Sequence, residues 1–261
     1  MKIWQLFWAQ PHKKLKPVQV FVNLGLVYLA LLGLLWGTLA TLNLTFDFSF
    51  VQDFQLRILD GFLLTFYLSL ASLCCSLILG TLSALGQLSP FLALRYLCQT
   101  YITFIRGTPL ITQIYLFFYI LGTAWGLENR FWSGVIILSL FEGAYIAEII
   151  RGSLLSLDPQ QLEAAKAVGF TRKQTLRHIV LPQLLARTIP ALTGQFASII
   201  KDSSLLSMIA VIELTQTFRE ISATNFQLFE CYFLLGLLYL ALTLPIAVIS
   251  KALERRFNYE T

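Results

Sequence analysis

The stretch Glu163-Ala164-Ala165-Lys166-Ala167-Val168-Gly169, which continues to Leu181-Pro182-Gln183, is a polar, helix-forming segment between two long apolar segments. Asp158-Pro159 precedes it as a helix-start signal, because Asp caps a first turn and proline fits there. Gly169 predicts the end of this helix, since glycine readily adopts the positive φ found there. A second helix is predicted from Arg172 to Val180, basic on one side. The segment is interpreted as a short docking helix whose small alanines let a partner approach; an ordinary amphipathic loop is the alternative.

Composition indicates a membrane protein. Hydrophobic residues make up 57% of the 261 residues and charged residues 13%, against about 25% charged in soluble domains. The net charge of +5 is interpreted as a sign of orientation in the membrane rather than of nucleic-acid binding, because the basic residues flank apolar segments. The four cysteines, Cys74, Cys75, Cys98 and Cys231, lie in apolar runs without zinc or disulfide spacing and are interpreted as small buried side chains.

Six segments are long and apolar enough to be spans, since a span needs about 20 mostly apolar residues. The second is long enough to tilt or project beyond the bilayer. Arg106-Gly107-Thr108-Pro109 predicts a break or re-entrant turn in the third, because proline removes a hydrogen-bond donor. The fifth contains Pro190 and runs into the polar run Lys201-Asp202-Ser203-Ser204. The first is interpreted as a retained span, being too long for a signal peptide. The predicted fold is all-α, with spans at 18–41, 60–88, 98–123, 131–150, 183–208 and 228–250.

The distribution of basic residues predicts the orientation. With a cytoplasmic N-terminus, only Arg57, Arg130, Lys201 and Arg219 of the 19 Lys and Arg residues fall outside the cytoplasm or within the membrane. The positive-inside rule therefore places both termini and the polar segment in the cytoplasm.

The spacing Glu163-Ala164-Ala165-x3-Gly169-x9-Ile179-x-Leu181-Pro182 resembles the EAA loop of permease subunits of ATP-binding cassette (ABC) importers. Further segments are similar to the polar amino acid uptake branch, the histidine and glutamine permease type. These are Arg106–Leu110, Gly143–Ile149, Gln195-Phe196, Lys201–Leu205 and Glu213-Leu214-Thr215.

The resemblance implies a type I ABC importer permease fold with a five-helix core after one additional N-terminal span. Residues 1–57 are predicted to hold the cytoplasmic tail, first span and external loop. Residues 58–256 are predicted to form the transmembrane domain, with the cytoplasmic coupling loop at 152–182. The implied location is the bacterial plasma (inner) membrane.

The resemblance also implies partners. Such permeases pair as homodimers or heterodimers, insert the coupling helix into a cytoplasmic ATPase, and receive an amino acid from an extracytoplasmic binding protein. No phosphate-binding Gly-x4-Gly-Lys-Ser/Thr motif occurs in the chain. ATP and magnesium are therefore expected on the partner ATPase, and no cofactor or metal is expected in this chain. The coupling residues implied are Glu163, Ala164, Ala165, Gly169, Phe170, Leu181 and Pro182.

Polar residues within spans are candidates for the substrate path, because ionisable groups at that depth are usually functional. Glu142 is predicted either to face the path and attract an amino group or to make a structural hydrogen bond. Glu148 is predicted to pair with Arg151 at i+3. Arg106, Gly107 and Pro109 are predicted to be structural. The other path candidates, for which interhelical packing is the alternative, are Thr65, Gln195, Ser198, Lys201, Asp202 and Ser203.

Other classes of function have little support in the sequence. Only His12 and His178 are present, and no metalloprotease or serine-hydrolase motif occurs, so an enzyme is not expected. A secondary transporter or channel that works alone is the alternative function, although such proteins often contain internal repeats and none is evident. The sequence leaves open which amino acid is carried and whether the chain imports or exports it.

Overall fold

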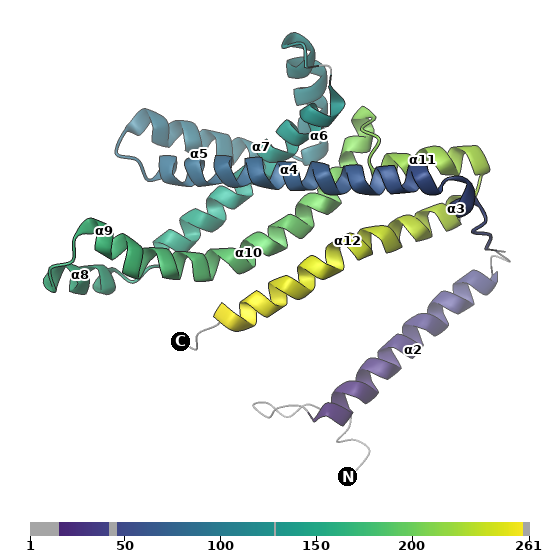
Figure 1. Cartoon of the computed structure of the whole chain (residues 1–261), viewed down its shortest axis with the longest axis horizontal. Helices are drawn as coiled ribbons and strands as arrows, with labels where there is room; N and C mark the ends of the chain where they lie inside the picture. Colours follow the sequence, from purple (N-terminus) through teal and green to yellow (C-terminus); the bar gives the residue numbers. More distant parts are fainter. Residues whose placement is uncertain (1–15, 42–45, 128, 258–261) are drawn as a thin grey trace. The chain divides into compact units, whose positions relative to one another are not determined.

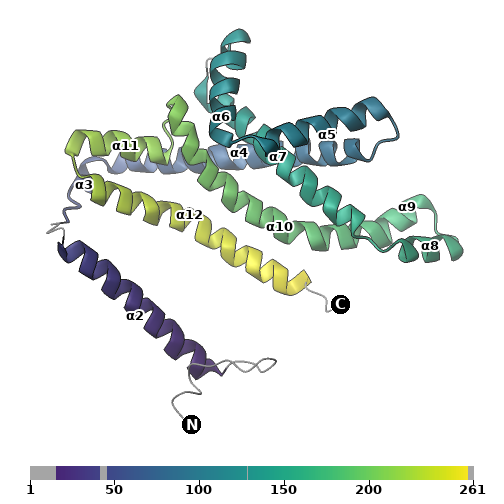
Figure 2. The same ribbon diagram turned by 180° about the vertical axis from the view of Figure 1, so that it is seen from behind.

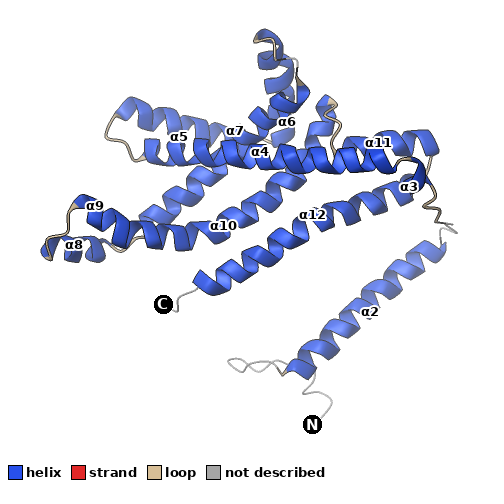
Figure 3. Cartoon of the chain, in the orientation of Figure 1, coloured by secondary structure: helices blue, strands red, loops and turns tan. Residues whose placement is uncertain are grey.

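The computed structural model describes residues 16–41, 46–127 and 129–257, and every regular element within them is helical (Figure 3). This confirms the all-α prediction. The chain divides into two compact units between Asp47 and Phe48. Lys2, Lys13 and Lys14, which support the predicted orientation, lie outside the described residues.

The first unit contains one long helix, α2 (Pro17–Thr41). Apolar residues lie on all sides of it, and none of its 25 residues is buried within the protein. A helix of this length and composition can cross a bilayer, in agreement with the predicted first span.

The centre of the second unit is the pair α4 (Gln55–Gln87) and α7 (Arg130–Leu155), its most extensive helix contact (Figure 1). A Cβ atom on Gly80 would lie 2.8 Å from Cβ of Ile146 and 2.9 Å from the carbonyl oxygen of Gly143. The two backbones therefore approach as closely as only small side chains allow. The buried face of α4 carries such residues along its length: Gly61, Thr65, Ser69, Ser72, Ser76, Gly80 and Ser83.

The third predicted span is broken, as the Arg106-Gly107-Thr108-Pro109 run predicts. Helix α5 (Leu92–Gly107) meets α6 (Leu110–Tyr115) and the π-helical turn η1 (Leu116–Gly122) at an angle of 113°. Buried Gln113 donates from Nε2 to the carbonyl oxygens of Ile105 at 2.7 Å and Thr108 at 3.1 Å. These bonds satisfy backbone acceptors that the break would otherwise leave open.

The polar segment forms the predicted helical hairpin at one end of α7 and α10 (Figures 1 and 2). Helix α8 (Pro159–Ala167) is followed by α9 (Arg172–Thr175), the π-helical turn η2 (Leu176–Val180) and α10 (Leu181–Asp202). The helical path continues through Pro182 without a break. Its ring crowds the carbonyl four residues earlier, and the wider π turn lies at that place.

Helix α10 ends at Asp202, in the polar run that interrupts the fifth predicted span. A 3-10 helix, η3 (Ser203–Ile209), and left-handed Ala210 (φ 53°) then turn the chain toward α11 (Leu214–Asn225). Helix α12 (Leu228–Phe257) returns beside α10, and the short α3 (Phe50–Asp53) precedes α4.

Four described helices are long and apolar enough to cross a membrane: α2, α4, α7 and residues Leu228–Leu253 of α12. The bent pair of α5 with α6 and η1 makes a fifth when counted as one span. Helix α10, predicted as a span at 183–208, is not among them. Amide, hydroxyl and charged side chains lower its apolar character, and these include the path candidates Gln195, Ser198, Lys201 and Asp202.

Candidate functional site

Helix α8 presents a polar surface with one buried anchor. The Asp158 carboxylate accepts from the Gln160 backbone N–H at 2.9 Å, so the predicted cap is present. Ala165 is only 3% exposed, whereas Glu163 and Ala164 are exposed. One face of α8 therefore packs inward while a short acidic and alanine surface is open to a partner.

The turn after α8 is shaped by Gly169, whose φ of 81° confirms the expected conformation. The Phe170 N–H donates to the Ala165 carbonyl at 2.9 Å, and the Phe170 ring lies 6.4 Å from the His178 ring. The Thr171 hydroxyl and the Gln174 side chain form a capping box that starts α9. The hairpin is thus closed by backbone geometry as well as by a side-chain contact between its two arms.

Hydrogen bonds from α10 reach the hairpin and the end of α7 just before it. Gln183 donates from Nε2 to Oε1 of Gln161 at 2.7 Å. Arg187 donates from Nη1 to the Ser156 carbonyl at 2.7 Å. Leu181 and Pro182 lie exposed where α10 begins. These tethers could not be predicted from the sequence, because their partners are more than 20 residues apart and no local spacing indicates them.

A second group of polar residues lies inside the helix bundle. Glu142 on α7 is fully buried, and Gln195 on α10 donates from Nε2 to its Oε2. The carboxyl group of Asp202 interacts with that of Glu142. Oε1 of Glu142 has no hydrogen-bond partner among the described residues. The structure therefore brings Glu142, Gln195 and Asp202 together.

The remaining path candidates are placed differently. Thr65 donates to the Gly61 carbonyl at 2.9 Å and accepts from the Leu214 N–H at 2.9 Å. Buried Ser203 donates to the Ile200 carbonyl at 2.8 Å. The Thr65 hydroxyl therefore links α4 to the start of α11, whereas the Ser203 hydroxyl makes only a local bond three residues back. Lys201 is exposed, and Ser198 makes a long bond of 3.5 Å to the Gly194 carbonyl.

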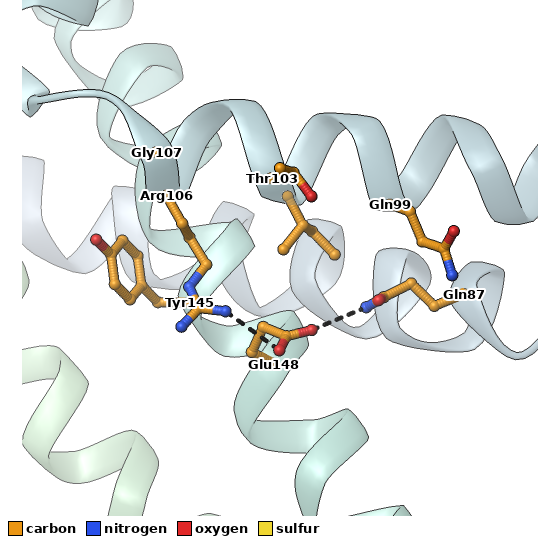
Figure 4. A pocket seen from close by; sticks show the side chains of 8 residues that line it. Gln87, Gln99, Thr103, Arg106, Gly107, Tyr145 and Glu148 are labelled. Atoms are coloured by element: carbon orange, nitrogen blue, oxygen red, sulfur yellow. Dashed lines mark hydrogen bonds and ion pairs between the residues drawn. The ribbon is translucent and has the colours of Figure 1, made fainter.

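Glu148 joins three helices. Arg151 binds it with two hydrogen bonds, of 2.8 Å and 2.9 Å, which is the predicted i+3 pair. Arg106 on α5 adds a 3.1 Å contact, and Gln87 at the end of α4 donates at 3.4 Å. The guanidinium carbon of Arg106 lies 5.4 Å from the centre of the Tyr145 ring. These residues surround an open cleft (Figure 4).

Glu213 holds the start of α11. Its carboxylate accepts from the backbone N–H groups of Thr215 and Gln216, each at 2.8 Å, and from the Tyr239 hydroxyl at 2.8 Å. Burial raises the pKa of the Glu213 carboxyl to about 7, while the hydrogen bonds that it accepts act in the opposite direction. Sequence reasoning singled out Glu213-Leu214-Thr215 but not Tyr239.

Comparison with known proteins places the chain among transport components. The family described as "Binding-protein-dependent transport system inner membrane component" matches residues 76–259. The probable glutamine ABC transporter permease protein GlnM of Bacillus subtilis (strain 168) is 34% identical over 200 residues, covering 77% of this chain and 93% of the relative. The L-cystine transport system permease protein TcyB of the same organism is 36% identical over 208 residues, covering 79% and 89%.

The glutamine transport system permease protein GlnP of Escherichia coli (strain K12) is 33% identical over 215 residues, covering 82% of this chain and 98% of the relative. Among solved structures, an amino acid ABC transporter with histidines matches with a TM-score of 0.75 at 30% identity, covering 82% of this chain and all of that chain. The MetNI methionine ABC transporter, at 17% identity and a TM-score of 0.62 over 77% of this chain and 98% of its own, shares the fold.

Proposed function

The chain belongs to the family of inner membrane components of binding-protein-dependent transport systems, and on this premise we propose its place in the transport cycle. It is a transmembrane permease subunit of an ATP-driven amino acid importer. The observation that carries the mechanism is the exposed α8–α9 hairpin, in which Gln161 accepts a hydrogen bond from Gln183 at the start of α10.

The energy for transport enters through this hairpin from a separate ATPase chain. The surface of Glu163 and Ala164 on α8 is the docking face, and buried Ala165 fixes α8 to the rest of the protein. ATP and magnesium bind on the ATPase, and this chain supplies no phosphate-binding loop. Movement of the docked hairpin passes to α10 through Gln183 and Arg187.

The substrate path runs beside the group formed by Glu142, Gln195 and Asp202. This group lies at the C-terminal half of α10, away from the hairpin. A buried carboxylate in a low-dielectric bundle attracts a cation strongly. The amino group of the substrate supplies that cation, and Gln195 orients the Glu142 carboxylate. The names of the relatives, which include glutamine and L-cystine permeases, support an amino acid as the substrate.

The assembly that fits this function has two permease chains, two ATPases and an extracytoplasmic binding protein. The α8–α9 hairpin lies on the cytoplasmic side in this arrangement, and both termini lie there too. The distribution of Lys and Arg residues supports this orientation.

The test changes the conformation of the hairpin. Gly169 has a φ of 81° and open space where a Cβ would stand, so Gly169→Val strains only the backbone, by about 1–3 kcal/mol. We expect the ATPase to be lost on co-purification and ATP-dependent uptake into proteoliposomes to fall with it.

Gly152→Ala is the matched control, since Gly152 also has open space around it but lies within α7 with ordinary helical φ. It is expected to retain the ATPase and uptake. Retained association and uptake in Gly169→Val and in Glu163→Ala would contradict the proposal and favour a transporter that works alone.

A further inference from the structure

The cleft beside Glu148 has the size of a small-molecule site. Its volume is about 450 Å³, within the range of roughly 300–1,000 Å³ usual for ligand pockets. It opens between the end of α4, the second half of α5 and the last third of α7 (Figure 4). Six polar or aromatic side chains line it: Gln87, Gln99, Thr103, Arg106, Tyr145 and Glu148.

The charges around the cleft do not balance. Arg151 already occupies both oxygens of the Glu148 carboxylate. Arg106 reaches the same carboxylate with a single 3.1 Å contact and has no other ion pair among the described residues. Two guanidinium groups thus share one carboxylate, which leaves one positive charge at the cleft without a counter-ion.

The Arg106 guanidinium group, which carries the unbalanced charge, is held in a defined orientation. The Tyr145 ring lies 5.4 Å from the Arg106 guanidinium carbon, and Glu148 holds one of its nitrogen atoms. Guanidinium has five N–H donors, so donors remain for a ligand, and 43% of the Arg106 side chain is exposed. A planar fork that is fixed in this way binds a carboxylate through two parallel hydrogen bonds.

Polar side chains extend the site along α5. Gln99 and Thr103 stand four residues apart and Arg106 three further on, so all three share one face of the helix (Figure 4). Gln99 and Thr103 are exposed and make no hydrogen bond to any other described residue. They can meet the amino group or polar side chain of a ligand whose carboxylate lies on Arg106.

We propose that this cleft is a second amino acid site, which binds the α-carboxylate of the transported molecule after release into the cytoplasm. This rests on the proposed function.

The cleft lies on a different side of α7 from the buried carboxylates. Glu148 lies about two helical turns before the end of α7 that leads to the hairpin. It faces α5, whereas Glu142 faces α10. Because the ligand would contact α4, α5 and α7 together, binding stabilises this arrangement of helices and slows the next cycle.

The test measures the effect of internal amino acid on uptake. The permease, its ATPase and the binding protein are placed in proteoliposomes with internal ATP, and uptake of labelled L-glutamine, L-cystine and L-arginine is measured. Whichever is transported is then loaded inside without label. We expect the internal amino acid to slow initial uptake by the natural chain, and its α-carboxamide to have no effect.

Arg106→Gln is expected to raise the half-inhibiting internal concentration about tenfold or more, since it removes charge-assisted hydrogen bonds. Thr103→Val, which leaves the Arg106–Glu148 contact in place, is expected to give a smaller rise. Uptake into vesicles that hold ATP but no internal amino acid serves as the check that each variant is folded. Arg219→Gln is the matched control, because Arg219 is exposed on α11 and away from the cleft.

Equal half-inhibiting concentrations for the natural chain, Arg106→Gln and Thr103→Val would overturn the second site. So would loss of the inhibition when phosphatidylglycerol is added to otherwise zwitterionic vesicles, since the cleft would then belong to a lipid phosphate. Absence of uptake by the natural chain is a different result, and it rejects the proposed function itself.

Discussion

The surroundings of three glutamates give them three different roles. Glu148 is bound by two arginines and Gln87 at the edge of a cleft. Glu213 caps a helix and receives the Tyr239 hydroxyl. Glu142 is fully buried with one amide donor and a second carboxyl group beside it. Glu142 therefore has the fewest donors for a negative charge among the three, and we propose that it attracts a cation that passes through.

Glu142→Gln tests this role at the level of one functional group. The change keeps the size of the side chain and removes its charge, so the substrate amino group loses a charged partner worth about 1.5–3 kcal/mol. We expect uptake in proteoliposomes to fall roughly tenfold, with a larger loss for cationic than for neutral amino acids.

Glu230→Gln is the control for Glu142→Gln, because Glu230 is also buried, at 8% exposure, but lies in the first turn of α12. Unchanged uptake together with unchanged substrate preference in Glu142→Gln would reject the path role and leave the structural hydrogen bond to Gln195.

Local spacing predicts some of these contacts and misses others. Glu148 and Arg151 are three residues apart on one helix, so their pairing follows from helix geometry. The contact of Arg106 with Glu148 spans two helices, and no spacing within either helix could indicate it. The same holds for Thr65 and Leu214, which are 149 positions apart in the sequence.

Helix ends and breaks in this protein follow from residues with strong backbone preferences. Asp158-Pro159 begins α8, Gly169 ends the hairpin's first arm, and Pro109 marks the bend between α5 and α6. What the sequence did not indicate is the 113° angle of that bend. It depends on Gln113, whose amide reaches back to carbonyl groups on the other side of the break.

Gly80→Ala tests the close approach of α4 and α7. The added methyl group would meet Ile146 and the Gly143 carbonyl at less than 3.0 Å, and such overpacking costs about 1–3 kcal/mol. We expect a lower thermal unfolding midpoint of the purified permease in detergent.

Gly236→Ala provides the comparison for Gly80→Ala, because nothing lies within 4 Å of a Cβ at that position on α12. Alanine is favoured over glycine within a helix by about 0.5–1 kcal/mol. The Gly236→Ala midpoint should therefore stay the same or rise. Equal midpoints for the two variants would show that the α4–α7 contact tolerates a methyl group.

Helix α10 connects the two proposed functional regions of the second unit. Its 22 residues span about 33 Å. The tethers Gln183, to the hairpin, and Arg187, to the end of α7 before it, lie near one end, with Gln195 and Asp202 toward the other. A displacement of the hairpin can therefore reach the buried carboxylates along one continuous helix.

The double change Gln183→Leu with Arg187→Gln tests this connection. It removes both tethers and leaves the exposed docking surface of α8 unchanged. We expect the ATPase to remain bound and active while the amount of amino acid taken up per ATP falls several-fold, measured by parallel uptake and phosphate-release assays.

Ser250→Ala is the control for the tether variant, since its hydroxyl donates from α12 to the Pro190 carbonyl of α10 at 3.3 Å without involving the hairpin. It should preserve the ratio of uptake to ATP hydrolysis. An unchanged ratio in the double variant would mean that the hairpin acts on the spans by another route.

The sequence by itself determined the membrane character, the helical class and the polar hairpin, because apolar run length, caps and glycine act over a few neighbouring residues. Six apolar segments were predicted, whereas the described helices provide four spans, or five with the bent pair. Only the tertiary structure decided that Glu142 meets Gln195 and Asp202, and that Arg106 reaches Glu148. Those pairings depend on how helices distant in sequence pack, and packing of α4 against α7 is set by the contact of whole faces rather than by any local pattern.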